Sequence, residues 1–177
     1  VNNFSCEKKK PADFTYPAEY WRKQNKSFMT QLPPASEKTL LTILVIEALD
    51  GQLITNKTET EIEEGAELLS SNTAKDILKI VVVNRYSNAP VAKAFIKNFG
   101  LKTGAIASSV AHDSHNIVAV GVDDESLCRA VNLVIHEKGG ISCVSKEAER
   151  VLALPVAGLM SNKNGYEVAE AYTAIDA

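Results

Sequence analysis

The stretch AHDSHN, residues 111–116, holds two of the chain's three histidines together with an aspartate, a serine and an asparagine. It lies between two apolar runs. Imidazole and carboxylate groups serve as metal ligands, as general acids and bases, and as hydrogen-bond partners for a polar ligand. The stretch therefore allows three interpretations: a metal site, a catalytic cluster or a polar turn.

A metal site held by this chain alone is disfavoured. Catalytic zinc usually takes three protein ligands, and His112, Asp113 and His115 would all have to come from one tight loop. The third histidine, His136, falls away from the apolar stripe of its predicted helix. The zinc deaminase pattern of H-x-E followed by P-C-x-x-C is absent from the sequence. We therefore expect no metal to be bound by this chain on its own.

Nucleophilic catalysis and phosphate binding also lack their usual motifs. No serine stands in a G-x-S-x-G context, and the glycines form neither G-x-G-x-x-G nor a Walker loop. The structural interpretation is a four-residue hairpin loop, HDSH, in which Asp113 and Ser114 bond nearby backbone N–H groups. Such a turn needs one or two polar side chains. Residues 108–116 hold seven that can hydrogen-bond: Ser108, Ser109, His112, Asp113, Ser114, His115 and Asn116.

A predicted hairpin, a strand and a helix precede this stretch. LLTILVIEA (40–48) and QLITNKTETEIE (52–63) have strand composition, and Asp50-Gly51 between them is a strong hairpin signal. ILKIVVVNRY (77–86) is nearly continuous in apolar residues, which is typical of a strand buried on both faces. The segment 88–100 predicts a helix that ends at a glycine, with proline in its first turn and apolar residues at i, i+4 and i+8: Val91, Phe95 and Phe99.

Strand-like runs at 103–111 and 116–122 flank the HDSH turn. Asp123 and Asp124 offer caps for the clearest amphipathic helix, which ends at Gly139-Gly140. A short strand at 141–145, an apolar segment at 151–161 and a final helix follow. The pattern predicts an α/β (α+β) fold: a mixed β-sheet with flanking helices, preceded by an irregular arm and a β-hairpin.

The composition argues against binding to nucleic acid or to a membrane. The formal charge of −3 gives no global basic field for nucleic acid or anionic lipid, and no apolar run is long enough to span a bilayer. Three widely spaced cysteines predict a reducing, cytoplasmic setting. Residues 1–40 carry seven basic and four acidic side chains and six of the eleven aromatic residues. We expect this arm to lie against its own domain or against another domain or subunit.

The run GAIASSVAHDSHNIVAVG, followed by DDESLCRAVN, GG and LPVAGLMS, resembles the C-terminal domain of the bacterial adenine deaminases of the amidohydrolase superfamily. VNNF near the start and DILKIVVVNR extend the resemblance over nearly the whole chain. Ala94 and Asn98 stand where that family has glycines, and NRYSN replaces a histidine-rich run. The resemblance divides the chain into residues 1–40, a connection to a missing N-terminal metal-binding barrel domain, and residues 41–177, the C-terminal domain itself.

The resemblance implies a hydrolase of purine salvage that converts adenine to hypoxanthine and ammonia. In that family a barrel domain holds two divalent metals, manganese or iron, which lower the pKa of a bound water, while a carboxylate moves protons. Three histidines without an H-x-H pair do not supply that site, and the lack of an initiator Met agrees with a piece of a longer enzyme. We expect the chain to complete or cover the purine site without being active alone.

The predicted partners are adenine, the N-terminal amidohydrolase barrel domain and further copies in a homo-oligomer, but neither nucleic acid nor a membrane. Asp113 would accept a hydrogen bond from a purine N–H, and His115 would donate to or orient the base. His112 and Ser109 would support them. The alternative is a purine-binding regulatory domain or an oligomerisation domain that contributes nothing to catalysis, and saturable adenine binding or a defined oligomer would favour it.

Overall fold

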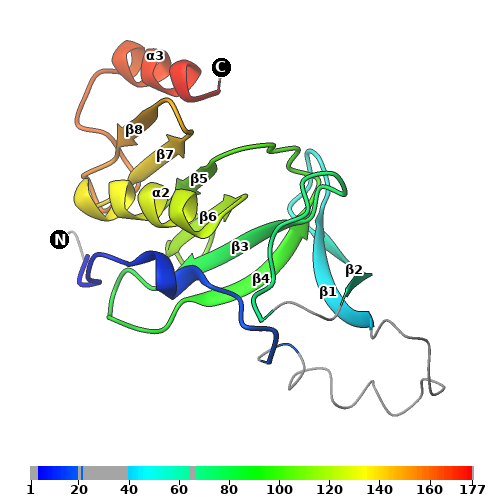
Figure 1. The fold of residues 1–177 in the computed structure, drawn as a ribbon. Helices are drawn as coiled ribbons and strands as arrows, with labels where there is room; N and C mark the ends of the chain where they lie inside the picture. The colour runs from blue at the N-terminus through cyan, green and yellow to red at the C-terminus, as the bar shows by residue number, and fades with distance from the viewer. Residues whose placement is uncertain (1–3, 20, 22–39, 64–66, 177) are drawn as a thin grey trace.

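The computed structural model describes residues 4–19, 21, 40–63 and 67–176. Its elements are η1 (Pro11–Phe14), β1 (Leu40–Ala48), β2 (Thr55–Glu63), β3 (Leu78–Val83), β4 (Ala92–Lys97), β5 (Ala105–Ser108), β6 (Ile117–Gly121), α2 (Asp124–His136), β7 (Gly140–Val144), β8 (Glu149–Ala153) and α3 (Gly165–Asp176). The described strands form one mixed sheet in the order β2-β1-β4-β3-β6-β5-β7-β8. Figure 1 shows α2 and the N-terminal segment on the same side of this sheet, with α3 beside β8. The predicted α/β class is confirmed.

The predicted hairpin is confirmed. β1 and β2 pair antiparallel from Leu40↔Glu63 to Ala48↔Thr55, with the Asp50-Gly51 turn between them. Gly51 has φ +67, a left-handed conformation that glycine adopts without steric cost. The other long edge of β1 pairs parallel to β4. The hairpin therefore extends the sheet beyond its buried centre.

The helix predicted at 88–100 is wrong, because this segment forms strand β4. Phe95 and Ile96 are both buried, and they belong to separate apolar clusters. Successive buried residues on opposite faces are a property of a central strand, which pairs here with β1 and β3. Phe99, the last residue of the expected stripe, is exposed. Asn98 then turns the chain with φ +73, a conformation that asparagine tolerates better than most residues.

Helix α2 forms as its sequence predicts. The Asp123 carboxylate accepts a hydrogen bond from the backbone N–H of Ser126 at 2.7 Å and caps the helix. Leu127, Val131 and Val134 are fully buried against the sheet, whereas the His136 side chain is 82% exposed. This packing covers one face of strands β5, β6 and β7.

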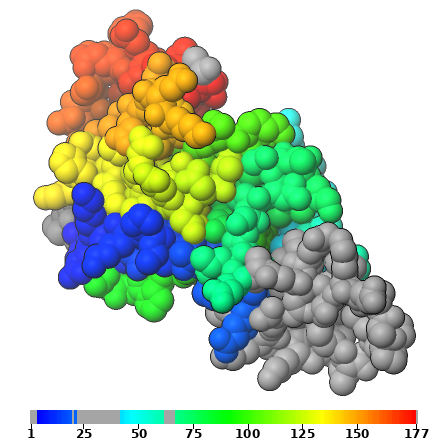
Figure 2. All heavy atoms as spheres, viewed as in Figure 1, coloured from blue at the N-terminus to red at the C-terminus, as the bar shows by residue number. Residues whose placement is uncertain are grey.

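The described part of the N-terminal arm packs on its own domain. Phe14, Tyr16 and Trp21 are buried in the same apolar cluster as Phe95, and the Tyr16 ring meets the Phe95 ring edge to face at 5.0 Å. The Tyr16 hydroxyl lies 2.7 Å from the carbonyl oxygen of Ile80 and 2.8 Å from that of Ala94, and burial raises its pKa. Figure 2 shows the described part of the arm, in blue, lying along the surface of α2. Tyr20, Phe28 and Pro33-Pro34 lie outside the described residues.

Helix α3 confirms the final predicted helix, but not one of its residues is buried. It contacts β8, while Tyr166 is 91% exposed. Within the described residues, no helix is both long and apolar enough to cross a membrane.

Candidate functional site

The AHDSHN loop connects β5 to β6 at one end of the sheet. The two strands pair antiparallel up to Ser108↔Val118, so residues 109–116 form the connection. The predicted hairpin is therefore confirmed, with a connection longer than four residues. Two of its residues, Asp113 and His115, have positive φ of 66° and 48°. Aspartate and histidine adopt this conformation more readily than most side chains.

Four of the seven polar side chains in 108–116 bind the protein itself. The Ser108 and Ser114 hydroxyls accept hydrogen bonds from the backbone N–H groups of Val110 and Asn116, at 3.0 and 3.3 Å. The Asn116 carboxamide oxygen accepts one from the backbone N–H of Arg85 at 3.3 Å. The fourth side chain, that of Ser109, bonds backbone groups at the base of the loop. These bonds shape the loop, and they leave three side chains to account for: His112, Asp113 and His115.

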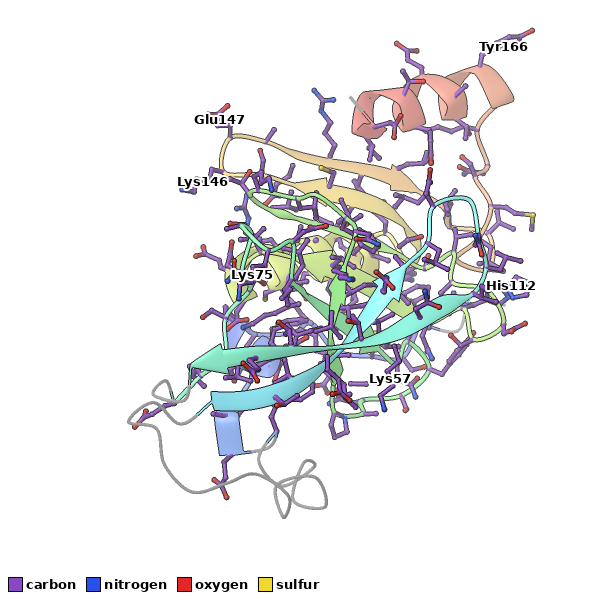
Figure 3. The ribbon with its side chains drawn as sticks, turned by 90° about the vertical axis from the view of Figure 1, so that its right-hand side faces the viewer. Lys57, Lys75, His112, Lys146, Glu147 and Tyr166 are labelled. Atoms are coloured by element: carbon purple, nitrogen blue, oxygen red, sulfur yellow. The ribbon has the colours of Figure 1, made fainter. Side chains whose placement is uncertain are left out.

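The side chains of His112 and Asp113 project from the loop into solvent. They are 86% and 90% exposed, and the Asp113 carboxylate lies 3.1 Å from Nδ1 of His112. Such an exposed pair contributes little to stability. Figure 3 shows His112 at the edge of the molecule, at the opposite end of the sheet from Lys146 and Glu147. The structural interpretation expected Asp113 to accept a hydrogen bond from a backbone N–H of the turn, but no such bond forms among the described residues. The side chains of His112 and Asp113 are both open to a ligand.

His115 combines partial burial with an unused polar atom. Its backbone N–H donates to the carbonyl oxygen of Ala111 at 2.9 Å and closes the loop. Its Nδ1 is buried and has no hydrogen-bond partner among the described residues. A buried polar atom without a partner costs free energy, and proteins usually satisfy such atoms. His115 is therefore the loop residue with a buried polar atom that the described part of the chain leaves unsatisfied.

Ser109 occupies a different environment, because it is fully buried. Its hydroxyl donates to the carbonyl oxygen of Gly158 at 2.6 Å and accepts from the backbone N–H of Gly140 at 2.9 Å. The hydroxyl thus joins the base of the loop to the segment that follows β8. Any support that Ser109 gives to a ligand site is transmitted through this backbone contact.

Sequence reasoning missed Arg85, which lies at the same end of the sheet directly after β3. Only 5% of this arginine is exposed, and its Nη1 donates to the carbonyl oxygen of Ala157 at 2.8 Å. Its Nη2 donates to the hydroxyl of Tyr86 at 3.0 Å, and that hydroxyl donates to the carbonyl oxygen of Ser114 at 3.2 Å. The only signal in the sequence was one charged residue at the end of a nearly continuous apolar run.

The described residues do not fit a metal centre. They contain no group of three or more His, Cys, Asp and Glu side chains placed to hold an ion. The thiols of Cys6 and Cys128 are buried, and burial raises the pKa of each. A raised thiol pKa disfavours the thiolate that a metal requires. The chemistry available at the AHDSHN loop is therefore hydrogen bonding and proton exchange.

Comparisons with known proteins point to one family. Residues 52–177 match the model of the adenine deaminase C-terminal domain. An adenine deaminase of Sulfurovum sp. (strain NBC37-1) is 55% identical over 132 residues, which cover 75% of this chain and 24% of the relative. An adenine deaminase of Borreliella burgdorferi is 40% identical over 177 residues, which cover 99% of this chain and 29% of the relative. The chain thus spans only about a quarter of the length of these curated relatives.

Proposed function

Because this chain belongs to the adenine deaminase C-terminal domain family, we propose that it is the C-terminal part of a longer enzyme that hydrolyses adenine to hypoxanthine and ammonia. The proposed enzyme acts in purine salvage in the cytoplasm and assembles as a homo-oligomer. Residues 1–40 connect the domain to an N-terminal amidohydrolase barrel. Light scattering on the full-length protein tests the oligomer directly.

One observation supports a role for the AHDSHN loop at the purine site. After the loop's own hydrogen bonds are made, the side chains of His112, Asp113 and His115 remain, and His115 keeps a buried Nδ1 without a partner among the described residues. A purine edge presents N–H donors and ring-nitrogen acceptors. We assign Asp113 to accept from a purine N–H and His115 to donate to or orient the base. His112 supports Asp113, and Ser109 supports the loop from below.

The divalent metal of the proposed enzyme, manganese or iron, belongs to the barrel in this proposal. The described residues of this chain do not fit a metal centre, so we assign to them no step that a metal carries. Their part is recognition of the base. Recognition by paired donors and acceptors discriminates strongly, because a wrong base leaves polar groups unsatisfied in a dry site.

The exposure of the loop tip explains why the domain would need the barrel. With 86% and 90% of their side chains exposed, His112 and Asp113 would form hydrogen bonds that water competes for. Covering the tip with a second surface would exclude that water and strengthen the same bonds. We therefore place the loop across the mouth of the barrel, where it completes the purine site.

Asp113→Asn and His115→Ala in the full-length enzyme test the proposal, with kcat/KM for adenine and metal content measured together. Replacing the charged acceptor of Asp113 by the neutral amide oxygen of asparagine, or removing the His115 hydrogen bond, predicts a fall of about ten- to a hundredfold in kcat/KM in a dry site. Metal content should not change. His136→Ala, which removes an exposed imidazole from α2, is the matched control. Unchanged kinetics in both loop variants would mean that the loop is only a hairpin turn. A loss of metal in either variant would mean that the loop supplies a metal ligand.

A further inference from the structure

Arg85 and Tyr86 contact the AHDSHN loop on both sides of His115. The backbone N–H of Arg85 donates to the side chain of Asn116, the residue after His115. The Tyr86 hydroxyl donates to the backbone carbonyl of Ser114, the residue before it, at 3.2 Å. The two neighbours of His115 are therefore held by one dipeptide from another part of the sequence.

The guanidinium of Arg85 holds Tyr86 in place. Its central carbon lies 4.8 Å from the centroid of the Tyr86 ring and 4.9 Å from that of the Phe4 ring, so the cation contacts both aromatic rings. Its Nη2 also donates to the Tyr86 hydroxyl. Arginine suits this position because its planar group can stack and donate at the same time. Lysine would keep the positive charge, but it would lose the planar group that stacks and donates at the same time.

The segment after β8 closes around the same guanidinium. The Ala157 carbonyl accepts from Nη1, and a Cβ added to Gly158 would lie 2.0 Å from that nitrogen. A side chain at position 158 would therefore displace the guanidinium from its present position. The position of Tyr86, and through it that of the loop, therefore depends on three segments that are distant in sequence.

We propose that Arg85 and Tyr86 are positioning residues, which hold the loop in the conformation that presents His115 and Asp113 to the purine. This inference rests on the proposed function of the loop. A loop with two non-glycine residues at positive φ and an exposed tip needs such external contacts to stay in one conformation. Without them, binding of the purine would have to order the loop. The apparent affinity for the purine would then fall in proportion to the fraction of molecules whose loop already has the binding conformation.

Tyr86→Phe in the full-length enzyme is the sharpest test. It removes one oxygen and keeps the aromatic ring over the guanidinium, and Tyr86 is 42% exposed, so the fold should persist. Losing this hydroxyl, which donates to the Ser114 carbonyl oxygen and accepts from Arg85, predicts about two- to tenfold faster amide hydrogen exchange in residues 109–117, with exchange in α2 unchanged. KM for adenine should rise by a similar factor of about two to ten, with kcat changed by less than about twofold. Tyr166→Phe, which removes an exposed hydroxyl from α3, is the matched control.

The two readouts separate the possible failures. Unchanged exchange in 109–117 would show that Tyr86 does not hold the loop and would overturn the inference. Faster exchange with unchanged KM, while His115→Ala still lowers kcat/KM, would overturn the positioning role and leave the proposed function standing. If Asp113→Asn and His115→Ala are silent as well, the proposed role of the loop at the purine site fails, and the positioning role fails with it. Exchange that rises equally in α2 would indicate general destabilisation and would also overturn the inference.

Discussion

The hydroxyl of Ser109 donates to the carbonyl oxygen of Gly158 at 2.6 Å, in a part of the molecule from which solvent is excluded. The same hydroxyl accepts from the backbone N–H of Gly140. One side chain therefore satisfies two backbone groups from different segments, at the base of the loop that we assign to the purine site. This contact links the stability of the domain to the geometry of the loop.

Ser109→Ala should lower the free energy of unfolding by about 2 kcal/mol or more, because both backbone groups lose their partner without gaining water. Ser108→Ala is the matched control, since that half-buried hydroxyl accepts only from the nearby Val110 N–H. Urea unfolding of the two variants measures the difference. Equal losses would mean that water or a shifted backbone replaces the Ser109 contact.

The isolated 177-residue chain should release no ammonia from adenine, even with added manganese. Its sequence has three histidines and no H-x-H pair, and its described residues contain no group of side chains placed to hold a metal. An ammonia assay on the purified chain, beside the full-length enzyme in the same buffer, provides the measurement. Turnover at an enzymatic rate by the isolated chain would contradict this expectation and the proposal that the barrel domain holds the metal.

Helix α2 and its packing were predictable from the sequence, and this packing can be tested. Val131→Asp should lower the free energy of unfolding by about 3 kcal/mol or more, because Val131 is fully buried and the new carboxylate has no partner there. His136→Ala, on the exposed side of the same helix, should change it by less than about 0.5 kcal/mol. Thermal melts of both variants decide the matter. Equal shifts would mean that the buried face of α2 is assigned wrongly.

Much of the fold follows from local signals. The β1–β2 hairpin has its Asp-Gly turn, and α2 has its aspartate cap and its 3.6-residue stripe. The failure at 88–100 has a physical cause. The spacing of Val91, Phe95 and Phe99 fits a helix, whereas the structure buries the adjacent Phe95 and Ile96 on opposite faces of the sheet. Only pairing with β1 and β3, which local sequence does not encode, selects the strand.

The candidate site, too, was only partly predictable from the sequence. The surplus of polar side chains indicated Asp113 and His115 as candidates from the sequence alone, because a turn does not need so many polar residues. Arg85 gave no comparable signal. Its role arises from contacts with Ser114, through Tyr86, and with Ala157, and these residues lie far apart along the chain. Such a role becomes visible only when the three segments are seen together.

The last prediction concerns Lys79 and Asp124, whose charged groups lie 2.5 Å apart beneath the N-terminal arm. The Lys79 side chain is 4% exposed, and its Nζ also lies 4.6 Å from the centroid of the Tyr16 ring. Lys79→Met should therefore lower the free energy of unfolding by about 2–4 kcal/mol, since it leaves the carboxylate of Asp124 partly buried without its cation.

A double variant and a surface pair make this measurement specific. Lys79→Met combined with Asp124→Asn should lose less stability than the sum of the single changes, because the second change removes the unpaired charge. Lys97 pairs with Glu47 at 2.8 Å in a more exposed position, where the hydrogen bond from Lys97 lowers the pKa of Glu47. Lys97→Met should shift the thermal midpoint by less than about 2 °C. If the Lys79 and Lys97 variants melt together, the buried pair contributes no more to stability than the exposed one.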